Sequence, residues 1–402
     1  MASQRPVTAL AVYTVTAAAD GERQERSSQA FRLALAAKVI VEGERNVDLL
    51  AGLLIYLAWN HHYMARQQLY QYLCLISGMT ADLGLYDHPP RGNVNDPTTA
   101  AELDRCFVGA YFLCSLAPPF AFNKHSPMRW TDNLRICADN VIQAGELQSD
   151  RSVGSLLELA AAADDLQTVL QATFKISTTS RQHSELQAKS AGQRLRALKR
   201  DHAALANNTI LAACSVDAQY KQILCSDNPD PSMMIQCACS AKEYFDDLLS
   251  RPPSSLHQLA IVDWMLMLHV AALMSRLSRQ AASATGWEHG ALTSMLQPEQ
   301  TMEKLLNHMA SAPASDLLAP RHGGLLHWLH QFVQNTKTIL LSGDSGVAAR
   351  QGDGADGRFR PVNNEVPLAS RGLPYQAQDR ATHTQTRGVL DHDFWRQMAN
   401  AG

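Results

Sequence analysis

The sequence predicts an all-α protein, with one large multi-helix domain followed by a disordered C-terminal extension. Apolar residues recur at helical spacing, most clearly in residues 48–63, where one stripe holds Leu49, Leu50, Leu53, Leu54 and Leu57. No segment alternates apolar and polar residues long enough to indicate a sheet. The 402 residues are 46% hydrophobic and 18% charged, which is a globular balance in a chain long enough to bury a substantial core.

The helix over residues 48–63 is expected to bury its leucine stripe, so that Leu54→Ala costs about 2–5 kcal/mol. The next helix covers residues 66–83 and ends at Gly84, a common helix stop. Residues 87–97 (DHPPRGNVNDP) have the composition of a loop.

A further helix is predicted from Thr99, which with Glu102 forms a capping box, to Leu116, before Pro118 and Pro119. The same apolar spacing then predicts helices over residues 130–144, 153–174, 185–205, 207–224, 232–249, 255–279, 297–309 and 325–341.

The composition changes near residue 343. Residues 1–342 form the helical domain, whereas residues 343–389 are rich in Gly, Asp and Arg and are expected to be a disordered linker. Residues 390–402 form a short amphipathic element, in which four large apolar residues fall at i, i+4, i+5 and i+8: Leu390, Phe394, Trp395 and Met398. A helix this short needs a groove, either in the helical domain itself or in a coactivator, although a tail that packs down without regulatory effect fits equally well.

The charge balance and the cysteines limit the classes of function. A net charge of -3 supplies no general attraction to nucleic acid or to an anionic membrane. No run reaches the roughly 18 apolar residues that span a bilayer, and threonines interrupt the apolar stretch near the N-terminus. The eight cysteines lie mostly within apolar helical patterns, which favours a reducing compartment and a soluble intracellular protein.

Several segments, taken in order, resemble the helical regulatory (middle homology) domain of fungal zinc-cluster transcription factors. The first is residues 43–63 (GERNVDLLAGLLIYLAWNHHY), and the second is residues 79–85, which close on Asp-Leu-Gly-Leu. The others are residues 102–113, Arg129-Trp130-Thr131, residues 241–256, residues 273–277 and Phe394-Trp395. The resemblance covers residues 9–341 together with that aromatic end.

This resemblance implies a transcriptional regulator in a fungal nucleus. Control of a secondary-metabolite gene cluster is expected only because such regulators are frequent there, and not from any residue. It implies contact with the transcription machinery or with a DNA-binding partner protein, and homodimer formation. The chain departs from the family in its cysteines, because the zinc cluster needs six closely spaced thiolates and Cys237-x-Cys239 is the one close pair. Direct DNA binding, zinc and other cofactors are therefore not expected, and the chain should act through a partner or be a truncated form.

Other interpretations of particular residues remain open. The adjacent His61 and His62 point about 100° apart on a helix, which favours a polar helix end over a metal site. The basic segment 181–202 could contact nucleic acid or serve nuclear import, but a solvated helix face with Leu186, Leu195, Leu198 and Leu205 beneath it is favoured.

Two alternatives to a regulator are a helical interaction scaffold without a transcriptional role and a helical enzyme of the terpenoid-synthase type. The paired acidic residues Asp164-Asp165 and Asp246-Asp247 suggest the enzyme, but neither pair has the third carboxylate that a magnesium motif needs one turn later. Exposed helix positions explain these pairs better, and the sequence contains no catalytic constellation.

Overall fold

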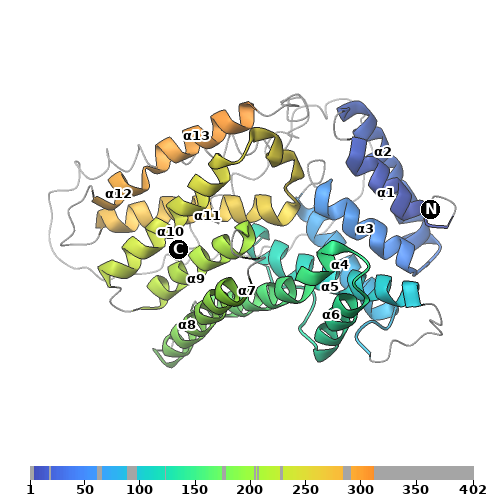
Figure 1. The fold of residues 1–402 in the computed structure, drawn as a ribbon, viewed down its shortest axis with the longest axis horizontal. Helices are drawn as coiled ribbons and strands as arrows, with labels where there is room; N and C mark the ends of the chain where they lie inside the picture. The colour runs from blue at the N-terminus through green and yellow to red at the C-terminus, as the bar shows by residue number, and fades with distance from the viewer. Residues whose placement is uncertain are drawn as a thin grey trace, which may run out of the picture.

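The chain folds into an elongated array of helices, seen in a computed structural model (Figure 1). The structure describes residues 4–17, 20–60, 66–87, 97–122, 124–173, 178–202, 205, 208–226, 230–283 and 291–311. Within these ranges there is no strand, so the predicted all-α class is confirmed. Residues 343–389, predicted as a linker, and residues 390–402, predicted as an amphipathic element, lie outside them, as does the predicted helix over residues 325–341.

The N-terminal half contains α1 (Pro6–Thr16), α2 (Gly21–Leu35), the π-helix η2 (Ala36–Val41), α3 (Val47–Trp59), α4 (Arg66–Asp82), α5 (Pro97–Phe122), α6 (Asp132–Ala144), the 3-10 helix η4 (Gln148–Ser152) and α7 (Val153–Thr173). The remainder contains α8 (Thr178–Asp201), α9 (Thr209–Cys225), α10 (Pro231–Ser250), the 3-10 helix η6 (Pro253–Gln258), α11 (Ile261–Ser283), α12 (Ala291–Leu296) and α13 (Pro298–Ala310).

Several helices begin at a residue that caps their free amides. The Asn46 side chain accepts a hydrogen bond from Leu49 N at the start of α3, and that of Asn208 accepts one from Leu211 N at the start of α9. Asp230 caps α10 in the same way, just before Pro231. Gly145, at a φ of 55°, ends α6 in the left-handed conformation that glycine tolerates.

The helices pack in a chain of neighbours around one continuous core. At one end α1 packs on α2 and α3, and in the middle α5 packs on α6, α7 and α11. Helix α8 packs on α7 and α9, and α9 packs on α10 and α11 (Figure 1). Helix α11 contains an 18-residue window, Ile261–Ser278, with the length and composition of a membrane span, but 67% of this window is buried inside the protein. A helix in the centre of a protein core has the same length and composition, and the burial of α11 identifies it as such a helix.

The structure corrects the predicted leucine stripe of α3. Leu49, Leu50, Leu53 and Leu57 are fully buried, but Leu54 is only partly buried at the edge of the core. Tyr56 occupies the buried face instead, where its ring stacks on Phe31 of α2 at 4.2 Å between centroids. Leu54 thus packs against the core without being fully buried, and its truncation should cost less than that of a fully buried leucine.

The structure also differs from the prediction at the N-terminus and at both ends of α5. Helices α1 and α2 precede residue 48, where no helix was predicted. Helix α5 begins at Pro97 rather than Thr99 and continues through Pro118 and Pro119 to Phe122. Phe120 lies beyond both prolines and is buried, with its ring edge against His269 of α11 at 4.9 Å. Burial of the apolar last turn offsets the backbone hydrogen bonds that the prolines remove.

Candidate functional site

The residues predicted to contact a partner, Leu390, Phe394, Trp395 and Met398, lie outside the described residues. The same holds for His61 and His62. The structure therefore leaves the predicted C-terminal contact and the two histidines as sequence-based predictions.

The close cysteine pair sits in two different surroundings on α10. Cys237 is fully buried and its Sγ lies 3.7 Å from the carbonyl oxygen of Val216, while the half-buried Cys239 Sγ lies 3.9 Å from Met295 Sδ. Burial raises the pKa of the Cys237 thiol to about 12, which disfavours the thiolate that binds metal. Among the described residues, no group of three or more His, Cys, Asp or Glu side chains is arranged to hold an ion.

Each acidic pair that suggested magnesium binding is engaged by basic side chains. On α10, Asp246 pairs with Lys242 at 2.9 Å and Asp247 pairs with Arg251 at 2.6 Å, each within one helical turn. On α7, Asp165 pairs with Arg194 of α8, which also contacts Glu158 at 3.3 Å.

Asp164 differs from its neighbours on α7. Burial and the adjacent Asp165 together raise the pKa of Asp164 to about 6. A carboxyl group with this pKa is only partly charged in weakly acidic solution, and it lies close to Tyr111 of α5, whose pKa is also raised by burial.

The outward face of α8 is the candidate contact surface that the structure best defines. Leu195, Leu198 and the nearby Leu205 are buried, as the sequence predicted for an amphipathic segment. Leu186, however, is 65% exposed, so its predicted position in the core was wrong. The Leu186 side chain faces water because Ser184 and Ala188 are the buried positions in this turn of α8, which begins at Thr178.

The basic residues of α8 fall into two groups. Lys189 pairs with Glu185 at 2.7 Å, and Arg200 pairs with Asp201 at 2.8 Å. Arg196 and Lys199 are exposed and have no acidic partner within the part of the chain that the structure describes. Leu186 lies about three to four helical turns from these two cations on α8, so a partner that contacts all three would be an extended acidic protein segment with an apolar anchor rather than a phosphate backbone.

A buried group of charges joins α9 to α11, and the sequence analysis missed it. Lys221 Nζ lies 2.5 Å from Asp217 Oδ2, and His269 Nε2 lies 2.8 Å from Asp217 Oδ1. Asp217 and Lys221 are each 1% exposed, and the Lys221 ammonium lies 6.0 Å from the ring centroid of Phe120. We call Asp217, Lys221 and His269 the buried charge cluster.

The state of Asp217 depends on its two partners. Burial alone would raise the pKa of Asp217, but attraction and hydrogen bonds from Lys221 and His269 lower it to about 2. The carboxylate is thus charged across the physiological range and fixes α9 to α11. A visible signal was the four-residue spacing of Asp217 and Lys221 within an otherwise apolar helix.

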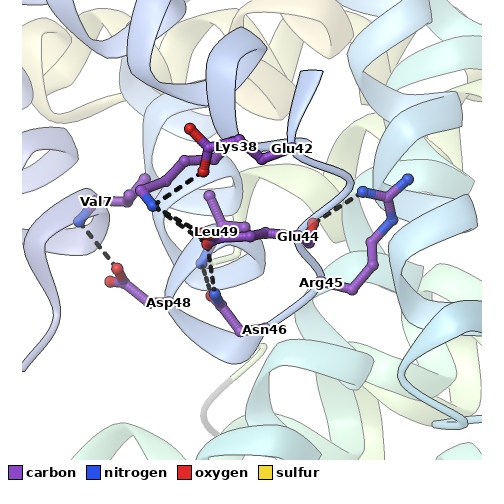
Figure 2. A network of polar contacts seen from close by, with 8 residues as sticks. All are labelled: Val7, Lys38, Glu42, Glu44, Arg45, Asn46, Asp48 and Leu49. Atoms are coloured by element: carbon purple, nitrogen blue, oxygen red, sulfur yellow. Dashed lines mark hydrogen bonds and ion pairs between the residues drawn. The ribbon is translucent and has the colours of Figure 1, made fainter. Parts of the chain in front are cut away.

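A second polar network holds the N-terminal helices together, and Figure 2 shows it from close by. Asp48, in the first turn of α3, accepts a hydrogen bond from the backbone amide of Val7 at 3.0 Å, which Figure 2 draws, and one from that of Thr8 at 2.8 Å. The Thr8 hydroxyl donates to the carbonyl oxygen of Asp48 at 3.1 Å. A carboxylate from one helix therefore caps the N-terminus of another.

The same network fixes the end of η2. Lys38 Nζ lies 3.1 Å from Glu44 Oε1 and 3.8 Å from Glu42 Oε2 (Figure 2). Arg45 donates to Val39 O at 2.9 Å and pairs with Asp82 of α4 at 2.8 Å. These contacts tie the segment after α2 to the start of α3 and to the end of α4.

Comparison with known proteins gives a distant relative. The chain is 22% identical over 297 residues to the transcription factor opdL of Penicillium oxalicum, an alignment that covers 62% of this chain and 50% of that protein. The chain thus spans about half the length of the curated relative that it matches. No family model matches the chain, and no solved structure matches it.

Proposed function

We propose that this chain is a regulatory region of a transcriptional regulator, acting through contacts with other proteins. The observation that carries the proposal is the similarity to a fungal transcription factor over 297 residues. The helical domain and the segments that resemble the regulatory domain of zinc-cluster factors are consistent with it. A helical scaffold without a transcriptional role is the alternative.

The outward face of α8 is the proposed contact for the partner protein. Arg196 and Lys199 supply positive charge without intramolecular acidic partners among the described residues, and Leu186 supplies an apolar anchor. The partner in this proposal is an acidic segment of the transcription machinery or of a DNA-binding protein.

A tethering assay in a fungal host tests the function. The full chain is fused to a heterologous DNA-binding domain, and expression of a reporter with the matching sites is measured. A regulator should change reporter output severalfold relative to the DNA-binding domain alone. A fusion that accumulates in the nucleus and leaves output unchanged would favour the scaffold.

The contact surface is tested in the same assay with Arg196→Glu combined with Lys199→Glu. A matched control carries Arg151→Glu and Lys304→Glu, which reverse two exposed charges on η4 and α13. If α8 is the contact, the first variant should lose most of its effect on the reporter and the control should keep it. Equal loss in both variants would point to net charge instead.

The finer proposal is a role in the nucleus in control of a secondary-metabolite gene cluster. Its support is the frequency of regulators of this family at such clusters, and not any residue of the chain. Transcript profiling after deletion of the gene tests it: coordinated change within one contiguous cluster is expected, and change scattered over the genome would contradict it.

A further inference from the structure

An exposed aliphatic stripe runs along the end of α2 and through η2. Leu33 is 65% exposed, Ile40 is 71% exposed and Val41 is 81% exposed. Ala36 and Ala37 lie between them and are also exposed. These five residues, here called the aliphatic stripe, are spaced at i, i+3, i+4, i+7 and i+8, so they share one side of the helix.

The stripe is the outer side of a helix whose inner side is well packed. Phe31, Leu35 and Val39 alternate with the stripe residues and are buried at 2% exposure or less. The helix itself lies at the outer edge of the molecule (Figure 1). The exposed residues therefore belong to a fully formed helix with its own core contacts.

The polar network of Figure 2 makes this surface rigid. Lys38 lies next to Ala37 and is tied to Glu42 and Glu44, and Arg45 donates to the carbonyl oxygen of Val39 within η2. These contacts join the backbone that carries Ile40 and Val41 to the segment before α3. A fixed, water-exposed aliphatic surface of this kind marks an interaction site.

We propose that the aliphatic stripe is the dimer contact of this chain, with the stripe of a second copy as its occupant. The order of residues is self-complementary, because large side chains at both ends flank two alanines at the centre. A two-fold axis at the alanines would let the helices cross closely and set Leu33 of one copy beside Ile40 and Val41 of the other.

The charges around the stripe agree with a second copy as the occupant. Before the stripe, α2 carries two acidic and two basic exposed residues: Glu22, Arg23, Glu25 and Arg26. Within and after it, two basic and two acidic residues pair with one another or with Asp82: Lys38, Glu42, Glu44 and Arg45. With no net charge at either end, the surface favours neither nucleic acid nor a strongly charged peptide, and two copies meet without net repulsion.

The size of the stripe sets the expected strength. Five residues make a smaller contact than the roughly 800 Å² per partner of a standard interface. The dimer should therefore be weak, with a Kd on the order of micromolar. This inference does not depend on the proposed function, since it concerns the self-association of the purified chain.

Sedimentation velocity of the full chain, from about 1 to 100 µM, tests the dimer across this range of affinity. The wild type should shift from monomer to dimer as concentration rises. Leu33→Glu combined with Ile40→Glu should raise the Kd roughly tenfold or more. The matched control is Leu147→Glu just before η4, because Leu147 is likewise an exposed leucine, at 54%, but lies outside the stripe.

Cross-linking then locates the contact. Ala37→Cys, in a chain whose exposed Cys74 is replaced by serine, should form a disulfide-linked dimer under mild oxidation, whereas the exposed Leu147→Cys in the same chain should not. Unchanged thermal unfolding of the double glutamate variant would show that it is folded. A chain that stays monomeric throughout, or a dimer equally strong in the Leu33→Glu, Ile40→Glu variant, would overturn the inference.

Discussion

The joint between α1 and α3 and the joint between α9 and α11 both depend on a buried carboxylate, but the two carboxylates have different partners. Asp48 accepts hydrogen bonds from two backbone amides at the start of α1. Asp217 faces a buried ammonium and an imidazole. Neutral amides can be solvated when the cap is lost, whereas a buried ammonium that loses its carboxylate stays charged in an apolar surrounding.

This difference predicts whether the loss of each carboxylate causes local or global unfolding. Loss of Asp48 frees the first turn of a terminal helix, which can open locally and hydrate. Loss of Asp217 leaves Lys221 in the middle of the core, where no local opening reaches water. The first joint should fail locally and the second globally.

The largest effect is expected from Asp217→Ala. Because it leaves the Lys221 ammonium buried without its partner, the free energy of unfolding should fall by about 3–5 kcal/mol. The measurement is urea unfolding followed by circular dichroism.

The control for this variant removes the cluster's charges together. Asp217→Leu combined with Lys221→Met replaces the pair by apolar groups, and its stability should lie within about 1 kcal/mol of wild type or above it. A loss below about 1 kcal/mol for Asp217→Ala alone would mean that water reaches Lys221.

The second effect is a pH dependence that belongs to the α9–α11 joint. The pKa of Asp217 is lowered to about 2 from an ordinary value of 3.8, so its stabilising contribution is complete above pH 4 and is lost as the pH falls toward 2. The stability of wild type relative to the Asp217→Leu, Lys221→Met variant should therefore fall by roughly 2 kcal/mol over this window.

Unfolding midpoints of the two proteins between pH 2 and pH 5 measure this difference. Groups that titrate equally in both proteins cancel in the comparison, so the remaining pH dependence of the stability difference comes from the buried charge cluster. A difference that stays constant over the window would show that Asp217 is not held charged by Lys221 and His269.

A smaller and more local effect is expected from Asp48→Ala. The amides of Val7 and Thr8 lose their acceptor, which should cost about 1–2 kcal/mol. Hydrogen exchange should become faster at the start of α1 while α9 and α11 keep their protection. Asp48→Asn retains an oxygen acceptor and should lose less; faster exchange spread over the whole chain would contradict local opening.

The sequence predicted much of the fold because the signals were local. The stripe of α3 follows from the leucines around Leu53, and the apolar spacing over residues 207–224 predicted the start of α9 to within two residues. Helix α1 was missed because its amides are capped by Asp48, 40 residues or more away in the chain. Helix α5 was predicted too short because Pro118 and Pro119 indicate a helix end in the sequence. The burial of Phe120, which favours continuation, depends on contact with α11.

The sites show the same limit. The spacing of Asp217 and Lys221 is visible in the sequence, but their contact with His269 joins residues 52 positions apart and requires the packing of α9 on α11. Likewise, the pattern of α8 placed Leu195 and Leu198 correctly, while the exposure of Leu186 depends on which turn of α8 contacts α7 and α9. Local periodicity gives the buried side of a helix, and tertiary neighbours decide where that side ends.

The smallest effect separates the side-chain and backbone parts of the α1–α3 joint. Thr8→Val removes the hydroxyl that donates to the carbonyl oxygen of Asp48 but leaves the Thr8 amide bonded to the carboxylate, so the loss should be about 0.5–1 kcal/mol. The control is Thr16→Val in the same helix, where the hydroxyl is exposed and bonds to carbonyl groups of α1 itself, and its effect should stay within about 0.5 kcal/mol. If Thr8→Val costs as much as Asp48→Ala, the hydroxyl rather than the carboxylate holds α1 to α3. The two contacts would then not both depend on a buried carboxylate.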